Sequence, residues 1–261
     1  MGKIIAICTS DVRGVQKQPR DTAWLDQDWG IRGDAHAGHW HRQVSLLSAE
    51  EIAAFNEKGA GVQPGAFGEN LVVEGIGLRC LPVGTLLGCG DAVLEITQIG
   101  KECHSHCAIY HKMGDCIMPR EGVFARVLEP GTIRVGDEMT IEPRKGVRPW
   151  QAAVITLSDK GARGEREGKS GPAIAARLRE CGYEVVEELL LADEPAALKA
   201  ALMRLSDQRQ LDLILTTGGT GFGPRDTTPE ATLQVATRQA PGIAEAIRAA
   251  SLKITPHAML S

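Results

Sequence analysis

The chain has 261 residues, a formal net charge of -4 at pH 7 and an aromatic content of 4%. The acidic balance, without a basic run, disfavours a nucleic-acid-binding protein, and the few aromatic residues leave little for stacking on single-stranded bases. No apolar segment approaches the length of a membrane span, and we expect no signal peptide at the N-terminus. Seven cysteines, an odd number without a disulfide framework, favour a reducing, cytoplasmic compartment.

The first part of the chain, residues 1–145, is dominated by short apolar runs that are separated by glycine. One helix interrupts them, with Ser48 as N-cap and Glu51 three residues later, as in a capping box. Many short strands with little helix predict a mostly-β barrel. The predicted strands are residues 3–8, 43–47, 70–73, 85–87, 92–97, 123–128 and 138–141. Residues 146–149 lie in a polar segment that we interpret as a linker to a second domain, residues 150–261.

The reactive side chains of the first part concentrate in residues 103–116, which hold three of the seven cysteines and three of the seven histidines. Their spacing, Cys-x₃-Cys-x₈-Cys, is not a familiar zinc pattern. Three interpretations stay open: a structural zinc site, thiols without a function, and a reactive thiolate. Lys101, His104 and His106 would help to lower the pKa of a neighbouring cysteine, which favours the reactive thiolate.

The second part reads as alternating strands and helices, which predicts a three-layer α/β domain with a parallel sheet. The strands are residues 152–157 and 183–191 and the apolar run that ends at Thr216-Thr217. A polar loop, residues 160–169, precedes a helix from Ser170. The apolar stripes of the two predicted helices are Ile174, Leu178 and Cys181 in the first, and Leu198, Leu202 and Leu205 in the second.

A glycine-rich loop, residues 218–226, follows the third strand. Gly218, Gly219, Gly221 and Gly223 would let backbone N–H groups approach a phosphate closely. Thr228-Pro229 supplies an N-cap and a first helical proline, so the helix does not need Asp226, and a free carboxylate there predicts a divalent cation. The spacing is neither a P-loop nor a dinucleotide fingerprint, and a glycine-rich turn without a ligand is the simpler alternative.

Polar groups also follow the other two strands, and the carboxyl ends of parallel strands share one edge of the sheet. Ser158-Asp159, Asp193 and residues 218–226 would therefore form one site. Alternatively, Asp193 could cap the helix that begins at Pro195, and Asp159 could be a turn residue.

The motifs at residues 155–159, 192–194, 215–221, 224–229 and 240–242 closely resemble the molybdopterin adenylyltransferase family of molybdenum cofactor biosynthesis. The resemblance implies a domain that usually trimerises and transfers AMP from Mg-ATP to the phosphate of molybdopterin. Its two essential acidic positions fall on Asp193 and Asp226. We expect Asp226 to position Mg²⁺ and Asp193 to assist the metal or the pterin phosphate. Its ligand-binding positions are Ser158, Asp159, Thr217, Gly218, Gly219, Thr220 and Gly221. The family continues beyond Ser261 through another strand and a Gly-x-Pro-Lys turn, so we expect this domain to be partial.

The motifs at residues 30–36, 64–71, 100–103 and 118–127 resemble a MOSC domain, which is named after molybdenum-cofactor sulfurases. The resemblance implies a β-rich barrel and a functional cysteine, Cys103, that carries a persulfide or ligates molybdenum. Cys107 and Cys116 are candidate resolving thiols. Candidate contacts to the pterin phosphate are Arg32, His36, Arg120 and Arg126. The family is also associated with pyridoxal phosphate.

The two resemblances together suggest one pathway on one polypeptide. The first hypothesis is an enzyme that adenylylates molybdopterin, with the barrel binding or sulfurating the cofactor. The second is a non-catalytic carrier of the cofactor or of sulfur, in which the second domain only docks a ligand or partner. A third is a molybdenum oxidoreductase in which Cys103 ligates the metal. The expected partners are other proteins of the pathway, apo-molybdoenzymes and further copies of the chain.

Overall fold

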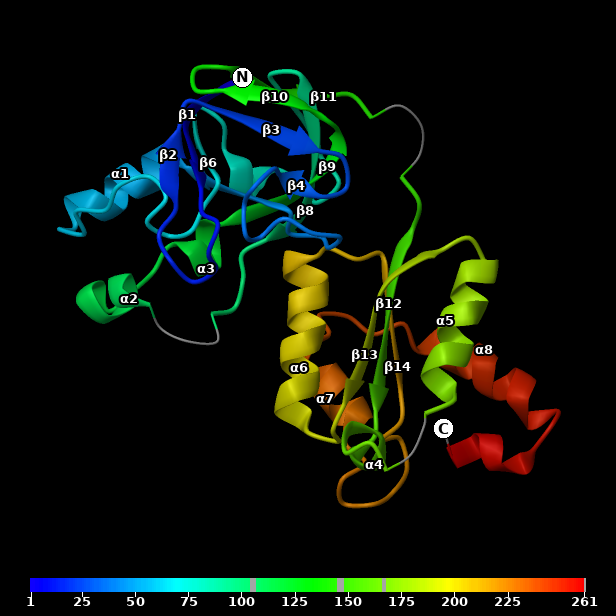
Figure 1. Ribbon diagram of the computed structural model, residues 1–261. Coiled ribbons are helices and arrows are strands. Elements are labelled where there is room, and N and C mark those ends of the chain that lie inside the picture. The colour runs from blue at the N-terminus through cyan, green and yellow to red at the C-terminus, as the bar shows by residue number, and fades with distance from the viewer. Residues whose placement is uncertain (104–106, 145–147, 166–167, 261) are drawn as a thin grey trace. The chain divides into compact units, whose positions relative to one another are not determined.

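A computed structural model describes residues 1–103, 107–144, 148–165 and 168–260. The chain divides into two compact units (Figure 1). The first comprises Met1–Arg148 with the short segment Asp207–Gln210, and the second comprises Pro149–Ser206 with Leu211–Ser261. Within the described residues, no helix is both long enough and apolar enough to cross a bilayer.

The first unit is a closed β-barrel, as predicted. Its strands follow one another in the order β11-β7-β8-β9-β5-β6-β1, and pairing of β11 with β1 closes the ring. Every pairing is antiparallel except that of β5 with β6. The barrel strands are β1 (Gly2–Thr9), β5 (Val44–Ser48), β6 (Leu71–Glu74), β7 (Leu86–Cys89), β8 (Ala92–Ile99), β9 (Val123–Glu129) and β11 (Glu138–Glu142). All seven predicted runs are therefore strands.

Four further strands were not predicted. β2 (Gln18–Arg20) pairs with β1, and a separate sheet has the order β10-β3-β4. The strands of this sheet are β3 (Thr22–Asp26), β4 (Gly30–Ile31) and β10 (Gly131–Arg134). β2 has the sequence Gln-Pro-Arg and is exposed throughout, and β4 has only two residues. Neither strand therefore shows the alternation of apolar and polar residues from which a strand is predicted.

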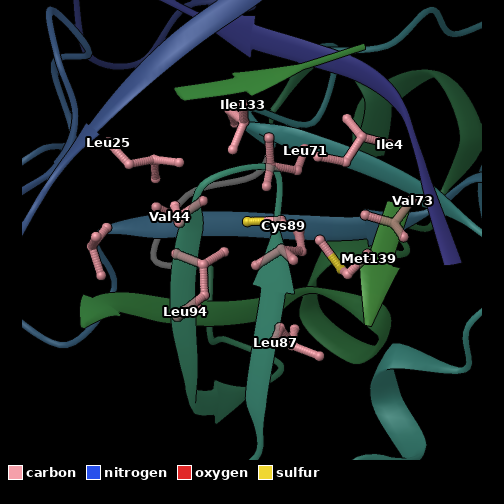
Figure 2. Close-up of a cluster of buried hydrophobic side chains, with 14 of the residues drawn as sticks. Ile4, Leu25, Val44, Leu71, Val73, Leu87, Cys89, Leu94, Ile133 and Met139 are labelled. Atoms are coloured by element: carbon pink, nitrogen blue, oxygen red, sulfur yellow. The ribbon is translucent and has the colours of Figure 1, made fainter. Parts of the chain in front are cut away.

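The interior of the barrel is filled by the inward side chains of its strands (Figure 2). Ile4, Leu71 and Leu94 are fully buried there. A second apolar cluster lies under α1 (Ala49–Glu57), where the rings of Phe55 and Phe67 pack edge to face with their centroids 5.7 Å apart. These two clusters hold the barrel and its helix together.

Ser48 caps α1 as predicted, because its Oγ accepts a hydrogen bond from the amide of Glu51 at 3.3 Å. The carboxylate that engages the Ser48 hydroxyl is that of Glu50, at 2.5 Å, and not that of Glu51. The expectation of one helix in this unit was wrong. α2 (Ala108–Met113), α3 (Met118–Glu121) and the 3₁₀ turn η1 (Leu78–Cys80) are also present, and all are too short to show an amphipathic period.

The second unit is an α/β domain with a parallel sheet, as predicted, and its strands have the order β13-β12-β14. The strands are β12 (Gln151–Leu157), β13 (Glu184–Leu191) and β14 (Leu213–Thr217). The helices are α4 (Asp159–Ala162), α5 (Ser170–Glu180), α6 (Pro195–Met203), α7 (Thr228–Val235) and α8 (Pro241–Leu252), with a π-helical turn at Arg204–Gln208 and a 3₁₀ turn at Pro256–Leu260.

Helices cover both faces of this sheet, and alternate residues of β12 pack against each side. Ala153 and Ile155 contact the cluster that contains Leu198, Leu202, Leu205 and Ala231 from α6, the turn after it and α7. Ala152 and Val154 pack with Ala175 and Leu178 of α5. Figure 1 shows α6 and α7 on one side of the strands and α5 on the other.

Two expectations for the helices were wrong. Cys181 is exposed just after α5 and does not continue the buried stripe, because the helix ends at Glu180. Residues 159–162, which the sequence indicated as a turn and the start of a loop, form α4. The Ser158 hydroxyl starts this helix by accepting a hydrogen bond from the Gly161 amide at 3.0 Å.

Candidate functional site

The carboxyl edge of the parallel sheet brings the three predicted segments together. Leu157 at the end of β12 lies opposite Leu191 at the end of β13, and Thr156 lies opposite Thr217 at the end of β14. The three strands therefore end at nearly the same level. Ser158-Asp159, Asp193 and the glycine-rich loop begin at this edge, next to α4 (Figure 1).

Asp159 and Asp193 are joined by a reciprocal pair of hydrogen bonds. The Asp159 amide donates to Oδ2 of Asp193 at 2.9 Å, and the Asp193 amide donates to Oδ1 of Asp159 at 3.1 Å. The other carboxylate oxygen of Asp193, Oδ1, is buried and has no hydrogen-bond partner within the described part of the chain. A buried carboxylate oxygen without a donor is costly in a protein, so this atom calls for a ligand.

Arg225 ties the glycine-rich loop to the same edge. Its Nε and one terminal nitrogen donate to the two oxygens of Asp159 at 2.6 and 2.9 Å, and it also reaches the carbonyl of Asp193 at 3.2 Å and Oε1 of Glu194 at 2.9 Å. The hydrogen bond from Arg225 holds the pKa of Asp159 below its usual value. Asp159 is therefore already engaged by a cation, whereas Asp193 presents a free oxygen. Sequence reasoning missed Arg225, although it stands within the motif at residues 224–229.

Two loop positions need glycine for space as well as for backbone angle. A Cβ at Gly218, where φ is +92°, would lie 2.1 Å from the Leu157 carbonyl oxygen. A Cβ at Gly219, where φ is +60°, would lie 2.4 Å from the Thr228 hydroxyl and 3.2 Å from Oδ1 of Asp193. The bare backbone at Gly219 thus runs directly beside the free oxygen of Asp193, where a phosphate ligand could meet its N–H groups.

Asp226 lies against the same loop. Its Oδ2 accepts a hydrogen bond from the Gly223 amide at 2.9 Å, and a Cβ at Gly221 would meet the same oxygen at 2.7 Å. Asp226 does not cap α7: the N-cap is Thr227, one residue before the expected position, and Pro229 lies in the first turn. Thr217 ends β14 and Thr220 is exposed at the loop.

The residues at this edge fit a hydrated magnesium ion. Mg²⁺ is held in proteins by one or two carboxylates, with water and substrate phosphates completing its shell. Asp193 and Asp226 offer two carboxylates beside one glycine-rich loop, and Oδ1 of Asp193 has no hydrogen-bond partner among the described residues. Within the described ranges, no three His, Cys, Asp or Glu side chains gather as a metal site, so the ion would depend on ligands from its substrate.

The barrel unit carries its own cavity, of about 550 Å³. His36, Arg42 and Lys101 line it, and no carboxylate does so among the described residues. The Arg42 guanidinium lies 4.8 Å from the ring centroid of Trp40 and 5.6 Å from that of Phe124, so aromatic faces hold it in the wall. This volume and this mixture of apolar and cationic groups suit an anionic ligand of ordinary cofactor size. Sequence reasoning missed Arg42.

Three thiols lie between this cavity and a smaller one of about 260 Å³. Cys103, Cys107 and Cys116 line both, and Lys101 lies in the larger cavity with them. Cys103 and Cys107 are exposed, whereas Cys116 is buried, and its burial raises the pKa of its thiol. All seven cysteines are free thiols. His104 and His106 lie outside the described residues.

The four predicted anion contacts of the barrel are dispersed. His36 lines the larger cavity, and Arg120 lines the smaller one, where its two terminal nitrogens donate to Asp115 at 2.9 Å each. These hydrogen bonds lower the pKa of Asp115 to about 2. Arg32 and Arg126 line neither cavity: Arg32 pairs with Asp26 at 2.6 Å, and Arg126 pairs with Glu95, also at 2.6 Å.

A buried polar network supports the larger cavity. Lys17 and Asp34 form an ion pair at 2.8 Å with no exposed side-chain surface. Asn70, which lines the cavity, donates to Asp34 at 3.1 Å, and the Nδ1 of His36 lies 3.5 Å from Asp34. Glu69 is also fully buried and accepts from the amides of the loop before it. Sequence reasoning assigned no role to Lys17, Asp34 or Glu69.

Comparison with known proteins identifies both parts of the chain and confirms both resemblances. Residues 153–261 match the family model described as a probable molybdopterin binding domain, and residues 33–140 match that of the MOSC domain. The molybdopterin adenylyltransferase of Helicobacter pylori strain J99 is 41% identical over 110 residues, which are 41% of this chain and 62% of that protein. The molybdenum cofactor biosynthesis bifunctional protein of Synechococcus elongatus is 43% identical over 110 residues, which are 42% of this chain and 34% of that protein.

Among solved structures, the molybdopterin biosynthesis enzyme MoaB of Thermus thermophilus is 46% identical. The match covers 43% of this chain and 70% of that chain, with a TM-score of 0.41. This chain thus spans 62% and 34% of the lengths of the two curated relatives.

Proposed function

Because this chain carries a MOSC domain over residues 33–140 and a probable molybdopterin binding domain over residues 153–261, we propose that it acts in molybdenum cofactor biosynthesis and adenylylates molybdopterin. In this reaction an oxygen of the molybdopterin phosphate attacks the α-phosphorus of ATP. The bond from the α-phosphorus to the bridging oxygen breaks, and pyrophosphate leaves. The names of the relatives over residues 153–261 support this assignment.

The observation that carries the proposal is the buried Oδ1 of Asp193, which has no hydrogen-bond partner in the described ranges and lies 3.2 Å from where a Cβ at Gly219 would be. A free carboxylate oxygen beside a bare glycine backbone combines a cation ligand with phosphate-binding amides. Phosphoryl and nucleotidyl transfer need these two elements, since the protein mainly positions two polyanions and balances their charge.

The roles of the residues follow from their contacts. Asp193 and Asp226 would hold Mg²⁺, which neutralises charge on the phosphates when it is bound. The amides around Gly218, Gly219 and Gly221 would receive phosphate oxygens. Ser158, Thr217 and Thr220 would supply polar groups around the ligands. Asp159 is a positioning residue in this scheme, because Arg225 and the Asp193 amide already occupy its oxygens.

For the barrel we propose a role in binding or sulfurating the same cofactor. The supporting observation is the 550 Å³ cavity, which combines Arg42, His36 and Lys101 with three thiols and has no carboxylate among its described lining residues. Cys103 is exposed at this cavity and is the candidate to carry sulfur or to contact molybdenum. The finished cofactor would then pass to an apo-molybdoenzyme.

The test is the conversion of molybdopterin and Mg-ATP to adenylylated molybdopterin by the full chain, followed by mass spectrometry. Asp226→Asn and Asp193→Asn are the site variants. Glu180→Gln is the control, since it removes an exposed carboxylate of α5 that pairs with the surface Arg177. We expect product from the parent and from the control, and strongly reduced product from both site variants. Binding of molybdopterin without any product would instead identify a carrier.

A further inference from the structure

Three of the six thiols in the first unit lie around the same two cavities. Cys103, Cys107 and Cys116 line both the 550 Å³ cavity and the 260 Å³ cavity, so they lie in the wall between the two. They differ in accessibility: Cys103 and Cys107 are exposed, whereas Cys116 is 7% exposed. A pair with one exposed and one buried thiol suits a division of roles, because only the exposed thiol can exchange with reagents in solution.

The larger of the two cavities beside the thiols favours a small anion, whereas Asp115 and Arg120 line the smaller one. Lys101 and Arg42 line the larger cavity with the thiols, and no carboxylate does so in the described part of the chain. A sulfur anion released at these thiols would therefore remain in a cationic space, next to any ligand bound there.

We propose that Cys116 is a resolving thiol that discharges a persulfide carried by Cys103. The Cys116 thiolate attacks the Cys103 sulfur, a Cys103–Cys116 disulfide forms, and the S–S bond of the persulfide breaks. The outer sulfur leaves with the bonding electron pair as hydrosulfide, HS⁻, into the larger cavity. An external persulfide or polysulfide loads Cys103 beforehand, and an external dithiol reduces the disulfide afterwards. This inference rests on the proposed sulfur-handling role of the barrel.

Accessibility assigns the resolving role to Cys116 and not to Cys107. An exposed resolving thiol would react with solution thiols and would itself be loaded by the sulfur donor. Burial is the largest influence on the Cys116 thiol and raises its pKa, whereas a hydrogen bond with the Met118 backbone lowers it. The neighbouring Cys107 and Cys103 raise the pKa, and Lys101 lowers it. The raised pKa makes the Cys116 thiolate scarcer than that of an ordinary cysteine, so discharge of the Cys103 persulfide is slower than its loading but proceeds without a further ligand.

The experiment uses the full chain in a Cys80→Ser, Cys181→Ser background, which removes the exposed thiols other than Cys103 and Cys107. The protein is loaded with sodium polysulfide and desalted, and sulfide release is followed without reductant. Peptide mass spectrometry maps the persulfide and any disulfide. We compare this background with Cys116→Ser, Cys116→Ala and the matched control Cys107→Ser.

We expect the Cys103 persulfide to decay as sulfide appears, with a Cys103–Cys116 disulfide in equal amount. Either Cys116 variant should retain the persulfide and release no sulfide, whereas Cys107→Ser should behave like the background protein. A stable persulfide in the background protein, or a disulfide from Cys103 to Cys107, would overturn the inference while Cys103 remains a sulfur carrier. Failure of Cys103 to take up sulfur would overturn the carrier role as well. If the Cys116 variants fold poorly, the disulfide that forms in the background protein still tests whether Cys116 or Cys107 is the resolving thiol.

Discussion

The backbone amides of Asp159 and Asp193 each donate a hydrogen bond to the carboxylate of the other residue, at 2.9 and 3.1 Å. This exchange locks the ends of β12 and β13 together. It also fixes the Asp193 side chain so that Oδ2 is engaged and Oδ1 faces the glycine-rich loop without a donor. The two acidic residues therefore differ in their contacts: both oxygens of Asp159 are held by Arg225, whereas Oδ1 of Asp193 is open to a ligand.

Asp193→Asn should reduce kcat/KM for adenylylation by roughly two orders of magnitude, the usual cost of losing one electrostatic contact to the transition state. The neutral amide still fills the same volume, so the melting temperature should change little. Steady-state kinetics and a thermal melt test both points. A variant with full activity would remove Asp193 from the site.

Gly218→Ala should destabilise the second unit by roughly 3 kcal/mol or more, because left-handed strain adds to overpacking against the Leu157 carbonyl. The matched control is Gly182→Ala. Gly182 has a similar φ of +85°, compared with +92° at Gly218, but has no atom within 4 Å of an added Cβ. Gly182→Ala should lower the free energy of unfolding by about 1 to 2 kcal/mol, which is the effect of left-handed strain without a steric clash. Urea unfolding of the two variants measures the difference, and equal losses would contradict the close approach at Gly218.

Arg225→Lys should lower kcat/KM about tenfold, because an ammonium group cannot reproduce the forked hydrogen bonds to Asp159 and Glu194. Stability should be unchanged, since the arginine is exposed. Arg177→Lys on α5, whose exposed arginine pairs with Glu180, is the control and should have parental kinetics. Hydrogen exchange of residues 218–226 should be faster in Arg225→Lys only. Unchanged exchange there would show that Arg225 does not hold the loop.

Asp34→Asn should destabilise the barrel by about 3 to 5 kcal/mol at neutral pH, because it removes the carboxylate that is hydrogen-bonded to the buried Lys17 ammonium. Fluorescence-detected urea unfolding reports on this unit, since three of the four tryptophans lie within it. Asp26→Asn, which removes the partner of the exposed Arg32, is the control and should change stability little.

The same carboxylate should make the barrel sensitive to acid. Burial opposes the ionisation of Asp34, but hydrogen bonds from His36 and Lys17 outweigh it and hold its pKa below the usual value. The folded state thus binds fewer protons than the unfolded state, so this stability is present above about pH 4 and is lost as the pH falls further. Burial raises the pKa of Glu69, so this carboxyl stabilises the folded state as the pH falls, opposite to the effect of Asp34. The acid-induced loss should be smaller in Asp34→Asn, and an equal loss would contradict the assignment.

The sequence was sufficient for the fold wherever apolar residues recur with a clear period. Such runs predict the seven barrel strands and the β12–α5–β13–α6–β14 order. The sequence also identified Ser48 as the N-cap of α1. Strand β2, which is exposed and polar, left no such signal. The ends of the three parallel strands could also be placed in advance, because the topology alone brings Asp159, Asp193 and the loop to one edge.

The remaining parts of the sites depend on contacts between distant residues that no local pattern encodes. Lys17 and Asp34 are charged and would be expected at the surface, yet their pairing leaves both fully buried. Composition could not distinguish Arg42, in the cavity wall, from Arg32, which pairs with Asp26 outside it. The choice depends on which residues the tertiary structure brings to the cavity wall.

The most direct test of the account is a single-turnover reaction with molybdopterin that carries ¹⁸O in its phosphate. The full chain is mixed with this substrate, ATP and Mg²⁺, and the products are resolved by mass spectrometry. We predict adenylylated molybdopterin that contains the label, together with unlabelled pyrophosphate. Release of AMP, or hydrolysis of ATP without a labelled adduct, would contradict adenylyl transfer at the edge that contains Asp193 and Asp226.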